Sequence, residues 1–344
     1  MSLTVDIKKD LGGFKLDVQF DTGGIMGILG PSGSGKSMTL KCIAGVERPD
    51  EGHIELNGVT LFDSRRGIDL KPQRRQVGYL FQNYALFPNM TVERNILCGL
   101  NREKDKAKGR EICRRYIKLM GLEGLENSYP HQLSGGQQQR AALARILVGS
   151  PRLILLDEPF AALDSHLRDR LLMETKGILD DFDGPVIAVT HNRDEAYDLC
   201  GTIGIMDGGS MLDHRDTKAL FRDPGSVAAA YITGCKNIAP AQKAGEYRLY
   251  VPDWGITLDA AKPVSDNVKA VGIRAHSFGE VSENSYPVEV LGIAEGPFED
   301  TLRFRYKGQS GASDDLWQRI PHSLRPPVPP DGMGVRAEDV LALE

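Results

Sequence analysis

The segment GPSGSGKS (30–37) constrains the fold more strongly than any other part of the chain. It follows a nearly continuous apolar run, GIMGILG (24–30), and leads into a helix-forming stretch that stops at Gly45. The pattern G-x-x-x-x-G-K-[ST] between a buried strand and a helix predicts a loop whose backbone N–H groups surround a phosphate, while the helix N-terminus adds a favourable dipole. The sequence therefore predicts an α/β fold that binds the phosphates of a nucleotide.

Each residue type in this loop suits a separate task. Glycines let the backbone wrap closely around a phosphate, because they carry no Cβ. The Lys36 ammonium is expected to reach the β- and γ-phosphates, and the Ser37 hydroxyl is expected to ligate Mg²⁺. The predicted nucleotide-binding residues of this segment are Gly30, Pro31, Ser32, Gly33, Ser34, Gly35, Lys36, Ser37 and Met38.

Two later apolar runs end in polar residues. RLILLDEP (152–159) carries Asp157 and Glu158 at its end, and PVIAVTH (185–191) ends in His191. Open parallel sheets bind ligands at the carboxyl ends of their strands, so we expect these side chains near the phosphate loop. Asp157 is suited to holding Mg²⁺, Glu158 to deprotonating a water molecule and His191 to contacting the terminal phosphate. These residues alone leave P-loop kinases and GTPases open.

The segment HQLSGGQQQRAALAR (131–145) begins a helix in an unusual way. Ser134 is a favourable N-cap, and Gln137 three residues later completes the pattern of a capping box. Gly135 and Gly136 nevertheless occupy the first turn, where each glycine costs on the order of 1 kcal/mol relative to alanine. A capping box explains the helix start, but it does not explain why two glycines are tolerated in the first turn.

These motifs resemble those of the ATP-binding cassette (ABC) ATPases. LSGGQ (133–137) resembles the signature sequence of that family and precedes LLDEP (155–159), which resembles its Walker B motif. LFQNYALFP (80–88) resembles the glutamine loop, AALD (161–164) the D-loop, and His191 the switch histidine. Together with the phosphate loop, the six elements follow one another in the order that the family has.

The resemblance implies a fold and a set of site residues. The fold is a P-loop cassette with a RecA-like core and a helical subdomain, and two copies form a head-to-tail homodimer that holds each ATP between the P-loop of one copy and the signature helix of the other. Glycines in the first turn of the signature helix would let it approach the γ-phosphate at backbone distance, which accounts for the two glycines. Further nucleotide contacts are implied for Ser134, Gly135, Gly136, Gln137 and Asp164. Catalytic roles are implied for Gln82, Glu158 and His191, and Mg²⁺ contacts for Ser37, Gln82 and Asp157, with ATP and Mg²⁺ as cofactors.

Three aromatic residues have less definite assignments. Phe14, in the alternating stretch FKLDVQF (14–20), is the candidate for stacking on the adenine base, because the family uses an aromatic residue from an early strand. Tyr84 and Phe87 follow Gln82 and look exposed. They either line a groove that receives a helix of a membrane permease or pack locally within the helical subdomain.

The composition changes beyond the cassette. Short alternating stretches separated by turn residues replace long helical periodicity, which predicts a small all-β barrel or sandwich. We therefore expect an ABC nucleotide-binding domain over 1–232 and an OB-like, TOBE/MOP-like regulatory barrel over 233–344, because the resemblance places such a barrel in importers. Arg274 and His276 are cationic candidates for an anion site there, or belong to a solvated loop.

Bulk properties restrict the class of partner. The formal net charge of −5 argues against a dedicated nucleic-acid-binding protein. No apolar run approaches the roughly 20 residues that span a bilayer, and the first residues lack the apolar region of a signal peptide, so we expect any membrane role to be exercised through partners. Five scattered cysteines indicate reduced thiols in a cytoplasmic protein.

Finer resemblance suggests the branch of the family. The stretches 12–20, 61–96 and 233–238 resemble molybdate/sulfate-type import ATPases, closest to the molybdate branch. This implies permease subunits and a periplasmic or lipid-anchored substrate-binding protein as partners, and a location on the cytoplasmic face of the inner membrane. An importer of sugar, polyamine or ferric iron, and a soluble ABC ATPase without transport, remain alternatives.

Overall fold

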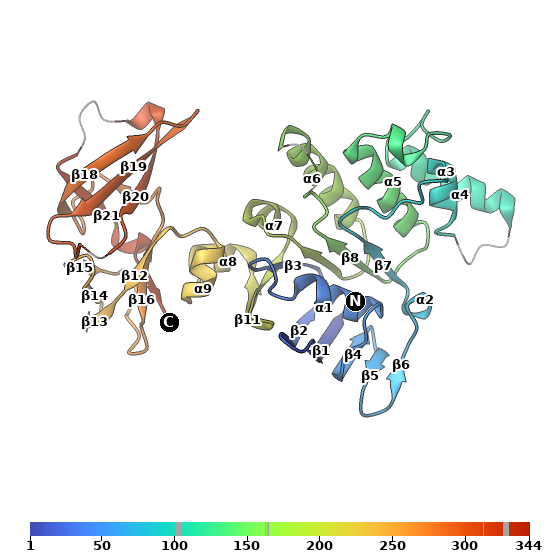
Figure 1. Ribbon diagram of the computed structural model, residues 1–344, viewed down its shortest axis with the longest axis horizontal. Helices are drawn as coiled ribbons and strands as arrows, with labels where there is room; N and C mark the ends of the chain where they lie inside the picture. The colour runs from blue at the N-terminus through green and yellow to red at the C-terminus, as the bar shows by residue number, and fades with distance from the viewer. Residues whose placement is uncertain (101–104, 162, 164, 312, 326–329) are drawn as a thin grey trace. The chain divides into compact units, whose positions relative to one another are not determined.

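The computed structural model describes residues 1–100, 105–161, 163, 165–311, 313–325 and 330–344 (Figure 1). The chain divides into two compact units, Met1–Thr217 and Lys218–Glu344. Each unit has a hydrophobic core of its own. Every helix in the described ranges is too short or too polar to cross a lipid bilayer.

One mixed sheet is the frame of the first unit, with described strands in the order β6-β5-β4-β1-β2-β11-β10-β3-β9-β8-β7. Its first part is mainly antiparallel and contains β1 (Leu3–Asp10), β2 (Lys15–Thr22), β4 (Glu51–Leu56), β5 (Val59–Asp63), β6 (Ile68–Asp69) and β11 (Ser210–Asp216). Its second part is parallel and contains β3 (Ile25–Leu29), β7 (Val77–Leu80), β8 (Leu153–Asp157), β9 (Val186–Val189) and β10 (Thr202–Asp207). The apolar sequences of β8 and β9 fit their complete burial between layers.

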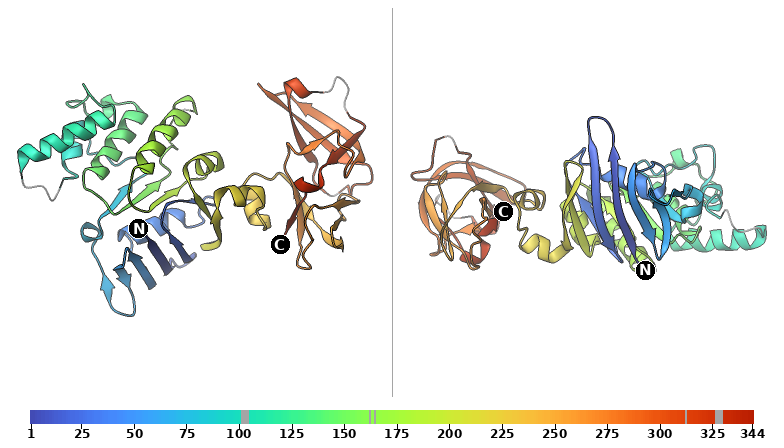
Figure 2. Two further views of the ribbon diagram at one scale, coloured as in Figure 1. Left: turned by 180° about the vertical axis from the view of Figure 1, so that it is seen from behind. Right: turned by 90° about the horizontal axis from the view of Figure 1, so that it is seen from below.

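Helices flank this sheet, and one group of them stands apart as the predicted helical subdomain. The helices of the unit are α1 (Lys36–Ala44), α2 (Pro72–Arg75), α3 (Val92–Leu97), α4 (Lys106–Leu119), α5 (Gly135–Leu147), α6 (Ser165–Asp180) and α7 (Arg193–Leu199), with a 3₁₀ turn η1 (Pro130–Gln132). Figures 1 and 2 show α3, α4 and α5 gathered beyond the end of β7 and β8. The α1 helix ends at Gly45, whose φ of 76° is the left-handed conformation that glycine favours.

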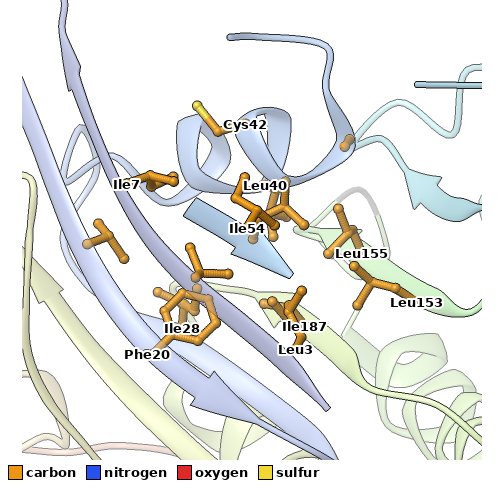
Figure 3. Packing of buried hydrophobic residues seen from close by; sticks show 14 of the residues in the cluster. Leu3, Ile7, Phe20, Ile28, Leu40, Cys42, Ile54, Leu153, Leu155 and Ile187 are labelled. Atoms are coloured by element: carbon orange, nitrogen blue, oxygen red, sulfur yellow. The ribbon is translucent and has the colours of Figure 1, made fainter. Parts of the chain in front are cut away.

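The main core lies between α1 and both parts of the sheet. Figure 3 shows Leu40 of α1 beside Ile54 of β4 and on the side of Leu155 and Ile187 of the parallel strands, whereas Cys42 of the same cluster points away from them. All five side chains are buried. This packing fixes α1, and the loop that precedes it, relative to both parts of the sheet.

A buried arginine joins the end of α1 to the segment that leads into β7. Arg75 is 1% exposed, and its guanidinium donates to the carbonyl oxygens of Cys42 at 2.9 Å and Ile43 at 2.8 Å, in the last turn of α1. It also donates to the carbonyl oxygen of Leu70 at 2.7 Å and to Asp69 Oδ1 at 2.9 Å. The guanidinium thus satisfies carbonyl groups that the helix end leaves unpaired.

We expect Arg75→Met to lower the free energy of unfolding by roughly 3 kcal/mol, because methionine fills similar space but leaves these buried acceptors unpaired. Urea denaturation followed by circular dichroism measures the change. Arg48→Met is the matched control, since the Arg48 side chain is 72% exposed and lies 3.7 Å from the same Asp69 carboxylate. An Arg75 variant as stable as this control would contradict the structural role of the buried guanidinium.

The second unit is built mainly of antiparallel strands. One described sheet contains β12 (Asn237–Pro240), β16 (Ala270–Ile273) and β22 (Leu341–Leu343), and another contains β13 (Gln242–Gly245), β14 (Arg248–Val251) and β15 (Ile256–Asp259). The third contains β17 (Phe278–Gly279), β21 (Gly332–Val335), β18 (Tyr286–Ala294), β19 (Glu299–Tyr306) and β20 (Leu316–Pro321), with 3₁₀ turns η2 (His322–Leu324) and η3 (Ala337–Asp339) nearby in sequence. Side chains of all three sheets share one core, as a small β domain requires. The predicted all-β character is confirmed.

The compact units divide at 217/218, before the change in composition at 232/233 that the sequence analysis used. The predicted boundary places helices α8 (Thr217–Arg222) and α9 (Val227–Ile232) in the cassette. The Arg274 guanidinium nevertheless donates to the carbonyl oxygens of Thr233 at 2.8 Å and Phe221 at 2.5 Å, which attaches this helical segment to the C-terminal strands. Arg274 therefore makes a structural contact, which neither of its two sequence interpretations, an anion site or a solvated loop, predicted.

Candidate nucleotide-binding site

The loop between β3 and α1 needs its glycines for backbone reasons. A Cβ on Gly30 would lie 2.0 Å from the carbonyl oxygen of Met206, so only glycine fits there. Gly33 and Gly35 have φ angles of 82° and 100°, in the left-handed region. The backbone therefore takes the wrapped form that a phosphate-binding loop requires.

Lys36 is enclosed by the loop to which it belongs. Its side chain is buried, and its Nζ donates to the carbonyl oxygens of Gly30 at 2.9 Å and Pro31 at 2.8 Å. Burial lowers the pKa of the Lys36 ammonium, and the nearby Glu158 and Asp157 carboxylates oppose that shift. The cation is thus held within the loop, near enough to Asp157 and Glu158 at the end of β8 to interact with their charges.

A second polar group in the loop is left without a partner. Ser34 is 2% exposed, and its Oγ makes no hydrogen bond within the described residues. An unpaired buried hydroxyl is costly unless a ligand satisfies it. This feature fits a loop that receives the oxygen atoms of a phosphate.

The carboxylate at the end of β8 is held on both sides. Asp157 is 7% exposed; Ser37 Oγ donates to its Oδ1 at 2.7 Å, and the Tyr79 hydroxyl donates to its Oδ2 at 2.9 Å. Burial, followed by the charge and hydrogen bond of Asp157, raises the pKa of the Tyr79 phenol, so the phenol remains a donor. The sequence analysis did not find Tyr79, because only the pairing of β7 with β8 brings the two residues together.

Glu158 lies between the two other predicted catalytic side chains. Gln82 Nε2 donates to Glu158 Oε2 at 3.0 Å, and His191 Nδ1 lies 3.4 Å from Glu158 Oε1. The Glu158 backbone has a φ of 47°, unusual for a residue with a Cβ, and its N–H donates to the carbonyl oxygen of Val189 at 2.9 Å. A strained conformation of this kind persists where surrounding contacts enforce it.

The backbone around His191 is fixed by its neighbours in sequence. Thr190 Oγ1 donates to Glu195 Oε2 at 2.6 Å, and Asn192 Nδ2 donates to Glu195 Oε1 at 3.2 Å. Asn192 also caps α7, accepting from the N–H groups of Asp194 and Glu195. The imidazole itself is 60% exposed, so these contacts, rather than burial of the ring, set its position at the strand end.

The predicted start of α5 is confirmed. The Gln137 N–H donates to Ser134 Oγ at 3.3 Å, and the Ser134 N–H donates to Gln137 Oε1 at 2.8 Å, which completes the capping box. Gly136 has a further reason that the sequence did not reveal, since a Cβ there would lie 2.7 Å from Leu171 Cδ1 of α6. A side chain at position 136 would therefore have to displace Leu171, which favours glycine there without any ligand.

The remaining predicted contacts lie at the border of the loop. A Cβ on Gly35 would lie 3.1 Å from the tip of the half-buried Phe14 ring, so the ring stands beside the phosphate loop. Met38 packs partly against the core, while Pro31 and Ser32 are exposed. Asp164 lies outside the residues that the structure describes.

The two aromatic residues after Gln82 differ in environment. Tyr84 is buried at 4% exposure, so the expectation that it is exposed is wrong. Phe87 is 48% exposed, and the Arg145 guanidinium of α5 lies 5.4 Å from the centre of its ring. Arg145 also donates to the carbonyl oxygens of Tyr84 at 2.9 Å and Ala85 at 2.7 Å, which fastens this segment to α5.

Comparison with known proteins agrees with this geometry. The ABC transporter family matches residues 14–161. A molybdate/tungstate import ATP-binding protein from Pyrococcus horikoshii is 36% identical over 303 residues, covering 84% of this chain and 84% of that protein. The chain belongs to the ABC transporter family.

Two further ABC relatives are longer than the region they share with this chain. A molybdenum import ATP-binding protein from Paramagnetospirillum magneticum is 39% identical over 224 residues, 65% of this chain and 61% of that protein. A sulfate/thiosulfate import ATP-binding protein from Chromobacterium violaceum is 41% identical over 239 residues, 70% of this chain and 63% of that protein. The chain thus spans less than two thirds of the length of each.

A solved ABC structure also matches. A dimeric structure of the ATP-binding cassette MJ0796, in a post-hydrolysis state with ADP and Pi, covers 63% of this chain and 99% of its own. The sequence identity is 29% and the TM-score is 0.53. The predicted P-loop ABC fold is therefore confirmed.

Proposed function

We propose that this chain is the ATP-hydrolysing subunit of an ABC importer. The observation that carries the proposal is the placement of Glu158, which follows a buried strand and contacts both Gln82 and His191. A carboxylate in this position, next to a phosphate loop with a buried Lys36, is equipped to act on the terminal phosphate of a nucleotide.

In this proposal the phosphate loop binds ATP through backbone N–H groups, Lys36 and the unpaired Ser34 hydroxyl. Phe14 is proposed to stack on the adenine base. Ser37 Oγ and Asp157 Oδ1, 2.7 Å apart, are hard oxygen donors of the kind that Mg²⁺ prefers, and Gln82 approaches the same edge through Glu158. When bound, Mg²⁺ would neutralise charge on the phosphates.

Glu158 is the proposed general base. Hydrogen bonds from Gln82 and, when its Nδ1 is protonated, from His191 fix the direction of the carboxylate, so that it can take a proton from an attacking water molecule. His191 is exposed enough to contact the γ-phosphate as well. In this proposal Glu158 removes the proton, and Gln82 and His191 orient the carboxylate that does so.

A head-to-tail homodimer is proposed to complete each site. Ser134 is exposed at the N-terminus of α5, and the first turn of that helix offers N–H groups to an anion. In the dimer the segment Ser134, Gly135, Gly136 and Gln137 would meet the γ-phosphate bound by the other copy, with Asp164 at the same interface. The dimeric state of the MJ0796 cassette supports this arrangement.

We expect Ser134→Arg to abolish ATP-dependent dimerisation without weakening ATP binding to the monomer, because the side chain would occupy the space of the opposing phosphates. Ser134→Asp should act in the same way through charge repulsion, while keeping an N-cap. Light scattering with ATP in a hydrolysis-deficient background measures dimerisation. Ser150→Arg, at an exposed serine just beyond the far end of α5, is the control, and a Ser134 variant that dimerises like it would refute the composite site.

The proposed cargo is molybdate or a related oxyanion such as tungstate or sulfate. Support comes from the import functions in the names of the relatives, which include molybdenum, molybdate/tungstate and sulfate/thiosulfate. The proposed partners are membrane permease subunits and, through them, a periplasmic or lipid-anchored substrate-binding protein, with the chain on the cytoplasmic face of the inner membrane. Uptake of labelled molybdate and sulfate by cells lacking this chain tests the cargo, since unchanged molybdate uptake with loss of another cargo would exclude molybdate.

Regulation by the transported anion is proposed for the C-terminal unit. His276, Phe278 and Gln318 line a cavity of about 300 Å³ within this unit. Titration of the full chain with molybdate in a calorimeter, beside its effect on ATPase rate, tests the proposal. Absence of binding heat and of inhibition would leave the unit without an anion-sensing role.

A further inference from the structure

Tyr79 makes a contact that the proposed mechanism has not used. Its hydroxyl reaches the carboxylate at the end of the neighbouring strand, within the part of the site assigned to Mg²⁺. We propose that Tyr79 is a positioning residue that holds the Asp157 carboxylate in the orientation required beside a Mg²⁺–nucleotide complex. This inference rests on the proposed ATPase function.

The two oxygens of Asp157 have different partners. Oδ1 accepts from Ser37, which is itself a proposed metal contact, and Oδ2 accepts from Tyr79. Ser37 Oγ has one O–H donor and two lone pairs, so it could ligate Mg²⁺ through a lone pair while its O–H still donates to Oδ1. Tyr79 is the donor to the other oxygen, Oδ2, so the orientation of the carboxylate depends on both hydroxyl groups.

The Tyr79 phenol is itself held in place. Its ring centre lies 4.2 Å from that of Phe81 on the same segment, and the side chain packs against the main core. In the parallel register of β7 and β8, Tyr79 stands opposite Leu155, two residues before Asp157. Backbone pairing and ring packing together direct the hydroxyl toward the end of β8.

Loss of the phenol would leave one oxygen of a buried carboxylate without its donor. The terminal torsion of an aspartate is broad, so hydrogen bonds, rather than the torsion itself, define its plane. Lys36 is close enough for its charge to interact with Asp157. If the carboxylate were free to turn, Lys36 would compete with Mg²⁺ for it. Groups that orient a metal ligand commonly contribute 10- to 100-fold to metal affinity.

The test is Tyr79→Phe, which keeps the ring and removes only the hydroxyl. A fluorescent ATP analogue is titrated onto the full chain in EDTA, and its binding is then followed against increasing Mg²⁺. We expect affinity in EDTA to stay within about twofold of wild type, and the Mg²⁺ concentration at half-maximal effect to rise by roughly tenfold. The Mg²⁺ requirement of ATP hydrolysis should shift in parallel.

Tyr286→Phe is the matched control, because it removes a tyrosine hydroxyl that donates to the carbonyl oxygen of Thr257 in the C-terminal unit. Thermal melts of both variants report any general loss of stability. An unchanged Mg²⁺ midpoint in Tyr79→Phe, or an equal loss of affinity with and without Mg²⁺, would overturn the positioning role. Wild-type protein that fails to bind ATP would instead overturn the function on which this inference rests.

Discussion

Replacing Glu158 with glutamine is expected to lower the rate of ATP hydrolysis by at least about 100-fold, the range that removal of a general base typically produces. Glutamine has nearly the same shape, and its remaining carbonyl oxygen can still accept one of the two contacts that Glu158 receives from Gln82 and His191. ATP should therefore still bind, and an ATP-dependent dimer should accumulate because it no longer turns over. Phosphate release and light scattering measure the two effects.

The control for this prediction is Glu123→Gln, which makes the same chemical change at an exposed position. It should hydrolyse ATP at the wild-type rate. Turnover by Glu158→Gln within a fewfold of that control would remove Glu158 from the role of general base.

Replacing Lys36 with alanine or methionine is expected to weaken ATP binding by roughly 100-fold. The ammonium is buried and already desolvated, so its contacts with phosphate would be charge-assisted hydrogen bonds of the stronger kind. Methionine keeps the length of the side chain, which separates loss of charge from creation of a cavity. Equilibrium binding of a fluorescent ATP analogue gives the change in affinity.

Lys41→Ala, later on the same helix, is the matched control and should bind ATP normally. Thermal melts of the Lys36 variants report any loss of stability that follows from leaving the carbonyl oxygens of Gly30 and Pro31 without their donor. Retention of tight ATP binding by Lys36→Met would show that the ammonium does not face the phosphates.

The sequence could predict those parts of the site that depend on local rules. The glycines of the phosphate loop and the capping box of α5 each follow from a few consecutive residues. The approach of Glu158 to His191 follows from one more rule, that the ends of parallel strands meet at one edge of a sheet. The order of the six motifs along the chain then indicated the ABC family.

Other features depend on contacts between distant segments and could not be predicted in this way. Tyr79 reaches Asp157 only because β7 pairs with β8 in one register. Gly136 is favoured opposite Leu171 because a Cβ there would lie 2.7 Å from Leu171 Cδ1 of α6. The composition of α9 gave no sign that Arg274 would hold this part of the chain to the C-terminal strands.

Through Arg145, α5 connects the backbone segment after Gln82 to the start of the signature helix at Ser134. Arg145 donates to the carbonyl oxygens of Tyr84 and Ala85 near one end of the helix, and Ser134 lies at the other end, eleven residues away. At 1.5 Å per residue the two points are about 16 Å apart along a stiff rod. A displacement of the backbone at 84–85 would therefore move Ser134 together with the whole helix. The residues between them would not need to change their conformation.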